Sequence, residues 1–365
     1  MSGDPYANRV LGWDLLRGCC AYAVVIYHLL AWQKIADVHS IGFYAVYVFF
    51  ALSGASLTLN YYDPFVSRFS LRHFGQFLLT RFMRLAPLFY LLVLLSLPWK
   101  ITNAGFGPEL ASKLVSNLGF VFGFGTPLSN SMIVGGWSLG IEFVFYLIFP
   151  IFLIPLAVSR RATALVMLGL LGLQVIWIFG TVSSDTSSMA NLVAYHQIPA
   201  FSAYFFGGCI LGYAQKMQLP GSKIGLPVGV AGIVLAAVLF VGLNTAQAHQ
   251  VLFGWRAVIF VALCFFLVWW TGRIEMTGAF RWVAQKFGDV TYGVYLIHPF
   301  LFFGITGLVI PRLERMGLPE PSLASAICLG VTVMAMATLL AYLSERWLEK
   351  PVRQWVRRYA GRGET

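Results

Sequence analysis

The first strongly apolar stretch, residues 11–32, carries three ionisable side chains that could do chemistry inside a membrane. Asp14 and Arg17 are three residues apart, so on a helix they are neighbours that can form an ion pair. His28 follows Arg17 by eleven residues, and at about 100° per residue it returns to within about 20° of the same face. At about 1.5 Å per residue it lies roughly 16 Å further along that face. The spacing therefore predicts one polar stripe, although a snorkelling arginine and an interfacial histidine are the alternative.

A second carboxylate, Glu142, lies inside another apolar stretch, which opens with Trp137 and Ser138. If successive stretches cross a membrane in opposite directions, Glu142 and His28 lie at similar depth near the outer surface. A neutral imidazole can take a proton from a hydroxyl, and a carboxylate can orient it and stabilise the imidazolium. We therefore expect a general base assisted by a carboxylate. A plain hydrogen bond between two helices is the alternative.

Four further polar residues fall in or beside apolar stretches. Arg81 and Arg84 share a helix face and could fork to phosphates, or they could simply anchor the chain at the cytoplasmic surface. Arg256 could contact a substrate, or it could snorkel toward the outer surface. His298, which precedes Pro299, could bind substrate or pack with its hydrogen bonds satisfied. Charged and polar groups inside a membrane are costly, so each is a functional candidate.

The composition identifies the elements that must position these residues. The chain has 365 residues, of which 59% are hydrophobic and 11% charged, whereas a soluble protein carries about 25% charged residues. The excess apolar surface must face lipid, and a spanning helix needs about 20 apolar residues. We expect an all-α integral membrane protein with about ten transmembrane helices in one domain, residues 1–345. The predicted spans are 11–32, 41–61, 85–101, 136–157, 163–182, 197–214, 225–243, 252–271, 290–310 and 322–343, with 114–125 as a re-entrant or interfacial piece.

The distribution of positive charge predicts the orientation. Most of the 25 lysines and arginines fall on one alternating set of loops, which the positive-inside rule assigns to the cytoplasm together with both termini. This bias explains most of the net charge of +11 without any nucleic acid. The first apolar stretch has no small-residue cleavage site after it, so we expect it to be retained. Residues 346–365, with Trp347 and Trp355 among basic residues, form a predicted amphipathic cytoplasmic tail.

Several motifs in order resemble acyltransferase family 3, the polytopic O-acyltransferases that modify bacterial surface sugars, Nod factors and some macrolides. The opening element is Asp14, Arg17 and His28, and the resemblance runs from about residue 9 to 355. The later elements are Leu52-Ser53-Gly54; Arg81, Arg84, Pro87 and Tyr90; Trp137-Ser138-Leu139, Glu142, Phe145-Tyr146 and Pro150; Gly288, Tyr292, Tyr295-Leu296 and His298; and Glu349 with Pro351.

The sequence also departs from the family pattern. Leu15 replaces a usual glycine, and Ala55 replaces a common aromatic residue. Phe143 replaces a usual second acid after Glu142, which puts a mechanism with two acids there in doubt. The chain lacks the soluble esterase-like domain of some members, so we expect direct transfer of the acyl group to the acceptor.

The resemblance implies an acyl-CoA donor, commonly acetyl-CoA, with no tightly bound cofactor and no metal. The CoA phosphates would bind Arg81, Arg84 and Arg17 on the cytoplasmic side. His28 would act as base with Glu142, Arg17 and Asp14 in the catalytic group. An acyl-His intermediate is the other route that the sequence allows. The resemblance implies substrate contacts from Trp137, Ser138, Tyr146 and His298. Arg256 is a further expected substrate contact, from its position near the outer end of its apolar stretch.

The expected acceptor is a hydroxyl of a glycan or glycolipid, first an exopolysaccharide or O-antigen unit, in the bacterial inner membrane. Polysaccharide assembly machinery is then an expected partner. A macrolide or a lipid is the alternative acceptor. A transporter or flippase for a lipid-linked saccharide is the alternative function. The sequence has neither the two-fold repeat nor the paired broken helices typical of transporters.

Overall fold

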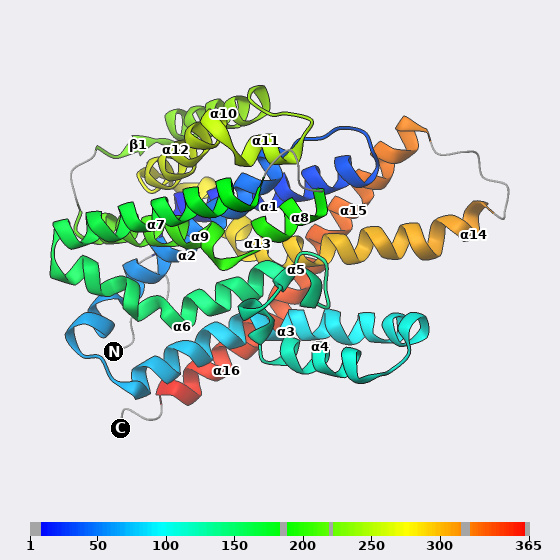
Figure 1. Ribbon diagram of the computed structural model, residues 1–365, viewed down its shortest axis with the longest axis horizontal. Helices are drawn as coiled ribbons and strands as arrows, with labels where there is room; N and C mark the ends of the chain where they lie inside the picture. The colour runs from blue at the N-terminus through cyan, green and yellow to red at the C-terminus, as the bar shows by residue number, and fades with distance from the viewer. Residues whose placement is uncertain (1–8, 183–187, 219–221, 315–321, 362–365) are drawn as a thin grey trace. The chain divides into compact units, whose positions relative to one another are not determined.

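The computed structural model describes residues 9–182, 188–218, 222–314 and 322–361, and over these ranges the chain is helical almost throughout (Figure 1). This confirms the all-α prediction. The β-structure in the described ranges is one parallel pair of two-residue strands, β1 (Ile224–Gly225) and β2 (Ile274–Glu275). The long helices are α1 (Leu11–Trp32), α2 (His39–Ser67), α3 (Leu71–Ala104), α6 (Trp137–Val158), α7 (Arg160–Thr181), α9 (Ile198–Lys216), α10 (Leu226–Gly242), α12 (Gly254–Thr271), α13 (Gly278–Gly304) and α15 (Leu323–Ser344).

Shorter helical segments connect the long helices or extend them. They are α4 (Pro108–Leu118), the 3₁₀ turn η1 (Val121–Phe124), α5 (Pro127–Asn130), α8 (Ser188–Tyr195), α11 (Ala248–Leu252), the π-helical η2 (Ile305–Val309), α14 (Ile310–Glu314), the π-helical η3 (Glu345–Glu349) and α16 (Lys350–Gly361). The predicted re-entrant piece 114–125 falls on α4 and η1, and its position relative to a membrane stays a prediction.

Eight helices in the described ranges are long and apolar enough to cross a membrane. A helix satisfies its own backbone hydrogen bonds, which lipid cannot do, and apolar side chains such as Leu165, Leu168 and Ile176 on α7 point outward. The chain is therefore a multi-pass membrane protein. Helices α9 and α10 occupy the other two predicted spans, and α10 is a shorter apolar helix. The count of ten spans and the cytoplasmic termini stay predictions.

The chain forms two compact units, each built from separated segments. Unit 1 comprises Met1–Val24, Val38–Phe74 and Leu147–Asp289, and unit 2 comprises Val25–Asp37, Gly75–Tyr146 and Val290–Thr365. These bounds assign the first part of α1 and of α13 to unit 1 and the remainder of each helix to unit 2.

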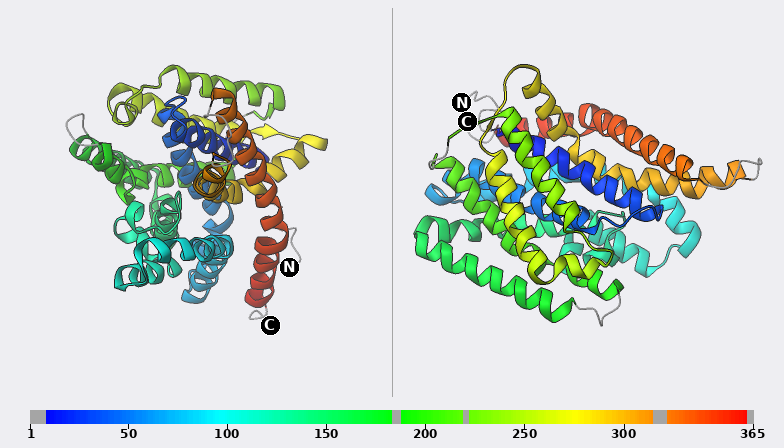
Figure 2. Two further views of the ribbon diagram at one scale, coloured as in Figure 1. Left: turned by 90° about the vertical axis from the view of Figure 1, so that its right-hand side faces the viewer. Right: turned by 90° about the horizontal axis from the view of Figure 1, so that it is seen from above.

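Unit 1 is organised by the close packing of α2 along α9, seen from three directions in Figure 1 and Figure 2. Small residues line this contact. A Cβ added to Gly208 would lie 1.9 Å from the carbonyl oxygen of Ala51, and one added to Gly212 would lie 2.2 Å from that of Ala55. Membrane helices rely on such close backbone approach because lipid gives no hydrophobic drive between them. Helices α7 and α12 also pack against α9.

In unit 2 a buried asparagine shapes the segment that leads into α6. Asn117 is 0% exposed, and its amide nitrogen donates to the carbonyl oxygens of Lys113 and Asn130 at 2.7 Å each. Its amide oxygen accepts from the backbone N–H of Met132 at 2.9 Å. The segment then turns at Gly135, whose φ of +81° favours glycine. These contacts fix the start of α6 at Trp137.

Candidate active site

Two histidines of unit 2 meet through their rings, one from α1 and one from α13. Nδ1 of His28 lies 2.9 Å from Nε2 of His298, and the rings stack with centroids 5.2 Å apart. Nδ1 of His298 lies 3.0 Å from the carbonyl oxygen of Val294. His298 is 0% exposed, whereas His28 is only half-buried. The sequence made both residues candidates, but it did not predict that they touch.

An aromatic group surrounds this pair. Trp32 stacks on His28 with centroids 4.6 Å apart and an interplanar angle of 3°, and it lies 5.9 Å from the ring of His298. Phe302 and Phe303 pack on Trp32 at 5.0 and 4.8 Å. Sequence reasoning missed Trp32, although its position four residues after His28 puts it on the same helix face. The aromatic rings restrict the orientations that His28 can adopt.

The start of α6 meets α13 through a second polar contact in unit 2. The hydroxyl of Tyr295 donates to the carbonyl oxygen of Gly135 at 3.0 Å, and the Ser138 hydroxyl lies 3.0 Å from the Tyr295 oxygen. The ring of Tyr295 lies 6.3 Å from that of His298. The predicted substrate residues Trp137 and Ser138 are both buried. Unit 2 thus brings Ser138 and His298 to the same tyrosine.

Glu142 of α6 accepts a hydrogen bond from Tyr146, one turn later on the same helix. Tyr146 also interacts electrostatically with Arg84 and Arg81 of α3. Tyr292 of α13 donates to the carbonyl oxygen of Leu85, next to Arg84 in sequence. The predicted carboxylate and the predicted phosphate-binding arginines therefore belong to one polar cluster in unit 2.

The two arginines differ in their surroundings. Arg84 is exposed, and it interacts electrostatically with Tyr292 and Glu349. Arg81 is half-buried, with its guanidinium carbon 6.0 Å from the centroid of the Phe77 ring. Arg84 is the better placed of the two for contact with a ligand from solution.

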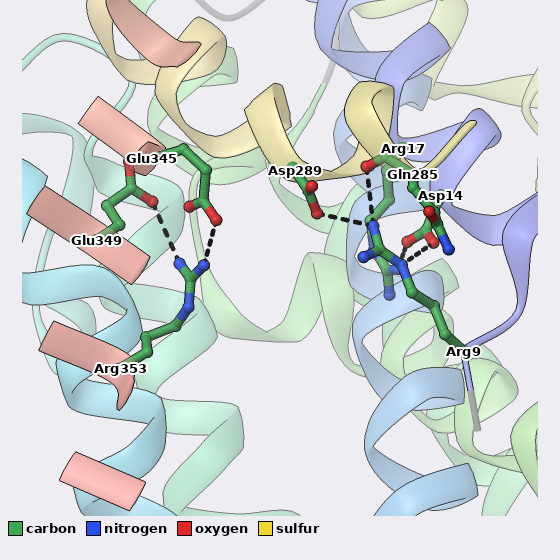
Figure 3. Close-up of polar contacts among 8 residues, drawn as sticks. All are labelled: Arg9, Asp14, Arg17, Gln285, Asp289, Glu345, Glu349 and Arg353. Atoms are coloured by element: carbon green, nitrogen blue, oxygen red, sulfur yellow. Dashed lines mark hydrogen bonds and ion pairs between the residues drawn. The ribbon is translucent and has the colours of Figure 1, made fainter. Parts of the chain in front are cut away.

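The C-terminal part of unit 2 is held by a cluster of ion pairs, shown in Figure 3. Arg353 bonds Glu345, and its other terminal nitrogen lies 3.7 Å from Glu349. Glu349 is 2% exposed and also accepts from the Ser344 hydroxyl at 2.8 Å. These contacts span the π-helical turn η3 and fix the start of α16. The predicted membrane-surface position of the tail stays a prediction.

A separate ionic network lies in unit 1 and contains the other predicted site residues, as Figure 3 shows. Asp14, 5% exposed, pairs with Arg9 and with Arg17, the latter at 3.3 Å. Arg9 also lies 2.9 Å from Asp289. Burial lowers the pKa of Arg9, but the carboxylates of Asp14 and Asp289 outweigh it, so the pKa is raised from its usual value.

Arg17 is held further by α2. It donates to the carbonyl oxygen of Leu52 at 3.1 Å and to the Ser56 hydroxyl. Gly288 lets α13 approach this network, because a Cβ there would lie 2.7 Å from the Cβ of Asp14. Leu52 and Gly288, both positions of the family motifs, therefore serve the same ion network. Leu52 accepts a hydrogen bond from Arg17, and Gly288 leaves room for Asp14.

The remaining candidate, Arg256 of α12 in unit 1, lies over the ring of Trp255 with its guanidinium carbon 4.7 Å from the centroid. No group of three or more His, Cys, Asp or Glu among the described residues could hold a metal ion.

The chain is a multi-pass membrane protein whose long apolar helices carry polar side chains. These are the histidine pair and the cluster of Arg84, Glu142 and Tyr146. The chain belongs to acyltransferase family 3, because the family's model, described as an acyltransferase domain, matches residues 10–345. The resemblance seen in the motifs is thereby confirmed.

Two relatives carry names that bear on activity. The peptidoglycan O-acetyltransferase OatA of Listeria monocytogenes is 26% identical over 93% of this chain and 55% of its own length. YrhL of Bacillus subtilis, provisionally named for the same activity, is 25% identical over 94% of this chain and 54% of its own length. The chain thus spans about half the length of the relatives it matches. No solved structure matches it.

Proposed function

We propose that the protein is a membrane O-acetyltransferase that moves an acyl group from cytoplasmic acyl-CoA to a hydroxyl of a saccharide. The observation that carries the proposal is the contact of His28 with His298 in a member of the acyltransferase family, with the ring of Trp32 stacked on His28. A half-buried imidazole held by a second ring has the accessibility and the fixed orientation that a general base needs.

The reaction balances with the residues assigned to it. His28 takes the proton of the acceptor hydroxyl while the hydroxyl oxygen attacks the thioester carbonyl carbon. The C–S bond breaks, and the proton on His28 passes to the CoA thiolate. The products are the O-acyl ester and CoA. Glu142, hydrogen bonded by Tyr146, is assigned to orient His28 or the acceptor hydroxyl.

Acyl-CoA, commonly acetyl-CoA, is the proposed donor, used as a substrate rather than as a tightly bound cofactor. Arg84 is exposed and interacts electrostatically with Tyr146, and Arg81 shares its helix face. A guanidinium can fork to a phosphate with two parallel hydrogen bonds. Arg17 is a third cation, but Asp14, Leu52 and Ser56 already engage it. We therefore assign the first phosphate contact to Arg84.

The acceptor is proposed to be a glycan of the cell surface. Both relatives are named for peptidoglycan, so a cell-wall glycan is the first acceptor to test. An exopolysaccharide or O-antigen unit comes next, with polysaccharide assembly machinery as partner, and a macrolide or lipid last. Ser138 and Tyr295 line the region of unit 2 next to His298 where such an acceptor would bind. The proposed location is the bacterial inner membrane.

The test compares two substitutions of His28. A general base supplies a gain of about 10² to 10⁴ in rate, so His28→Ala should lose that much transfer at normal membrane abundance. His28→Gln keeps a hydrogen-bonding group but cannot take a proton, and it should be as inactive as His28→Ala. Acyl-CoA binding should survive in both. Turnover in His28→Gln close to that of the unsubstituted protein would remove the catalytic role of His28.

A further inference from the structure

We propose that His298 is a positioning residue that sets the protonation of His28. It holds the proton of His28 on Nδ1, so that Nε2 is the nitrogen that acts as base. This inference rests on the proposed function of His28. It assigns a second histidine to the reaction, which spacing alone had offered only as a packing or substrate-binding residue.

The direction of the hydrogen-bond chain follows from its fixed end. Nδ1 of His298 lies 3.0 Å from the carbonyl oxygen of Val294, and a carbonyl oxygen can only accept. Nδ1 of His298 must therefore carry a proton. In its neutral form the ring then has no proton on Nε2, so Nε2 is an acceptor. Because Nε2 of His298 lies 2.9 Å from Nδ1 of His28, His28 must donate through Nδ1.

The consequence concerns the other nitrogen of His28. A neutral imidazole carries one ring proton, and with that proton on Nδ1 the unprotonated nitrogen is Nε2. When Nε2 gains the acceptor proton, His28 becomes an imidazolium whose Nδ1–H still donates to His298. That hydrogen bond is then charge-assisted and stronger, so it stabilises the charged state formed during reaction. The bond that forms is Nε2–H and the bond that breaks is the acceptor O–H.

The packing of unit 2 holds this arrangement in place. His298 is 0% exposed, which shields its contacts from competing water. Trp32 stacks on His28 at 4.6 Å and lies 5.9 Å from His298, so both rings share one aromatic neighbour. A preorganised orienting group of this kind does the task that a carboxylate performs in a Ser-His-Asp triad. Here the orienting group is a second imidazole whose direction is set by a backbone carbonyl.

Two substitutions separate positioning from packing, because one keeps the contact of His298 with Val294 and the other keeps its contact with His28. The side-chain amide of His298→Asn can donate to Val294 in place of Nδ1, but it is too short to reach His28. The longer amide of His298→Gln can offer its oxygen to His28 in place of Nε2. A residue that only holds α13 together would be better replaced by Asn. A positioning residue would be better replaced by Gln.

The experiment uses the full chain labelled with ¹⁵N-histidine, since the sequence has only six histidines and their signals can be assigned by substitution. In the unsubstituted protein His28 should show a protonated Nδ1 and an unprotonated Nε2. His298→Gln should keep that pattern, and His298→Asn should lose it. Acetyl transfer from acetyl-CoA to a glycan acceptor should be about tenfold or more faster in His298→Gln than in His298→Asn, with KM for acetyl-CoA unchanged.

His196→Phe is the matched control. His196 is also buried, and its Nδ1 also contacts the carbonyl oxygen four residues earlier, that of Leu192. This variant should leave the His28 signals unchanged. The proposal is overturned if His28 carries its proton on Nε2 in the unsubstituted protein or in His298→Gln, or if His298→Asn transfers as fast as His298→Gln. By contrast, full activity of His28→Gln would remove the catalytic role of His28 on which this inference rests, whichever proton position His28 shows.

Discussion

Removal of the Arg84 guanidinium should weaken acyl-CoA binding by an amount that follows from its exposure. A hydrogen bond to a charged group is worth about 1.5–3 kcal/mol. Because Arg84 is exposed, solvent screens the contact, so the lower part of that range applies, about 1.5–2 kcal/mol. Since 1.4 kcal/mol is a factor of ten, Arg84→Ala should raise the Kd for acyl-CoA by about 10- to 30-fold.

The measurement is equilibrium binding of acetyl-CoA to the purified protein, repeated with a donor that lacks the 3′-phosphate. If Arg84 contacts that phosphate, the substitution should weaken acetyl-CoA far more than the dephosphorylated donor. If it contacts the pyrophosphate, both should weaken equally. Arg84→Lys should recover only part of the loss, because a point charge lacks the guanidinium fork. The loss should also shrink as salt rises, because ions screen exposed charges.

Arg160 and Arg161 supply the control. They are also exposed, and they are the first two residues of the long apolar helix α7 in unit 1. Replacing both by Ala removes two positive charges without touching the cluster of Glu142, Tyr146 and Arg84. Unchanged binding in an Arg81→Ala, Arg84→Ala double variant would refute the donor site. So would an equal loss in the Arg160→Ala, Arg161→Ala control, because the effect would then be one of general charge.

Three further predictions concern the fold that carries the site. Gly208→Ala should lower the free energy of unfolding by about 1–3 kcal/mol, because its Cβ would lie 1.9 Å from the Ala51 oxygen. Gly172→Ala, whose Cβ would have nothing within 4 Å, should leave that free energy unchanged. Thermal unfolding of both variants in detergent measures the difference. Asp14→Asn should lower the free energy of unfolding by about 1.5–3 kcal/mol, because the half-buried Arg9 and Arg17 side chains lose their shared carboxylate. Asp14→Glu should recover part of the loss in the same assay. A topology reporter fused after Thr365 should report the cytoplasm, and one inserted near Asp185 should report the external side. Both positions lie outside the described residues. If both reporters give the same side, the ten-span count is wrong.

The helices could be predicted from the sequence because hydropathy and segment length are local properties. Each of the ten predicted ranges carries a helix. The π-helical turns at Ile305–Val309 and Glu345–Glu349 could not be predicted in this way, since inserting one residue in a turn changes neither hydropathy nor length appreciably. The glycines of α9 were not assigned from sequence either, because their partners on α2 are known only once the two helices are packed.

The site was predictable in its members but not in its contacts. Helical spacing identified Arg17 and His28, and it paired Asp14 with Arg17 as the structure has them. It did not pair His28 with His298, which lies 270 residues away, because that contact depends on how helices pack rather than on any local pattern. The bond from Tyr146 to Glu142 spans four residues and was available from spacing, but the partner sought for Glu142 was a histidine.

The most direct test of the proposed activity is transfer of label from radiolabelled acetyl-CoA by the purified protein, with cell-wall glycan and exopolysaccharide as acceptors. The proposal predicts label in O-acetyl esters of the glycan, lost in His28→Gln and retained in His196→Phe. It is contradicted if no label leaves acetyl-CoA while the purified protein moves a lipid-linked saccharide across a bilayer, because the polar side chains would then serve transport.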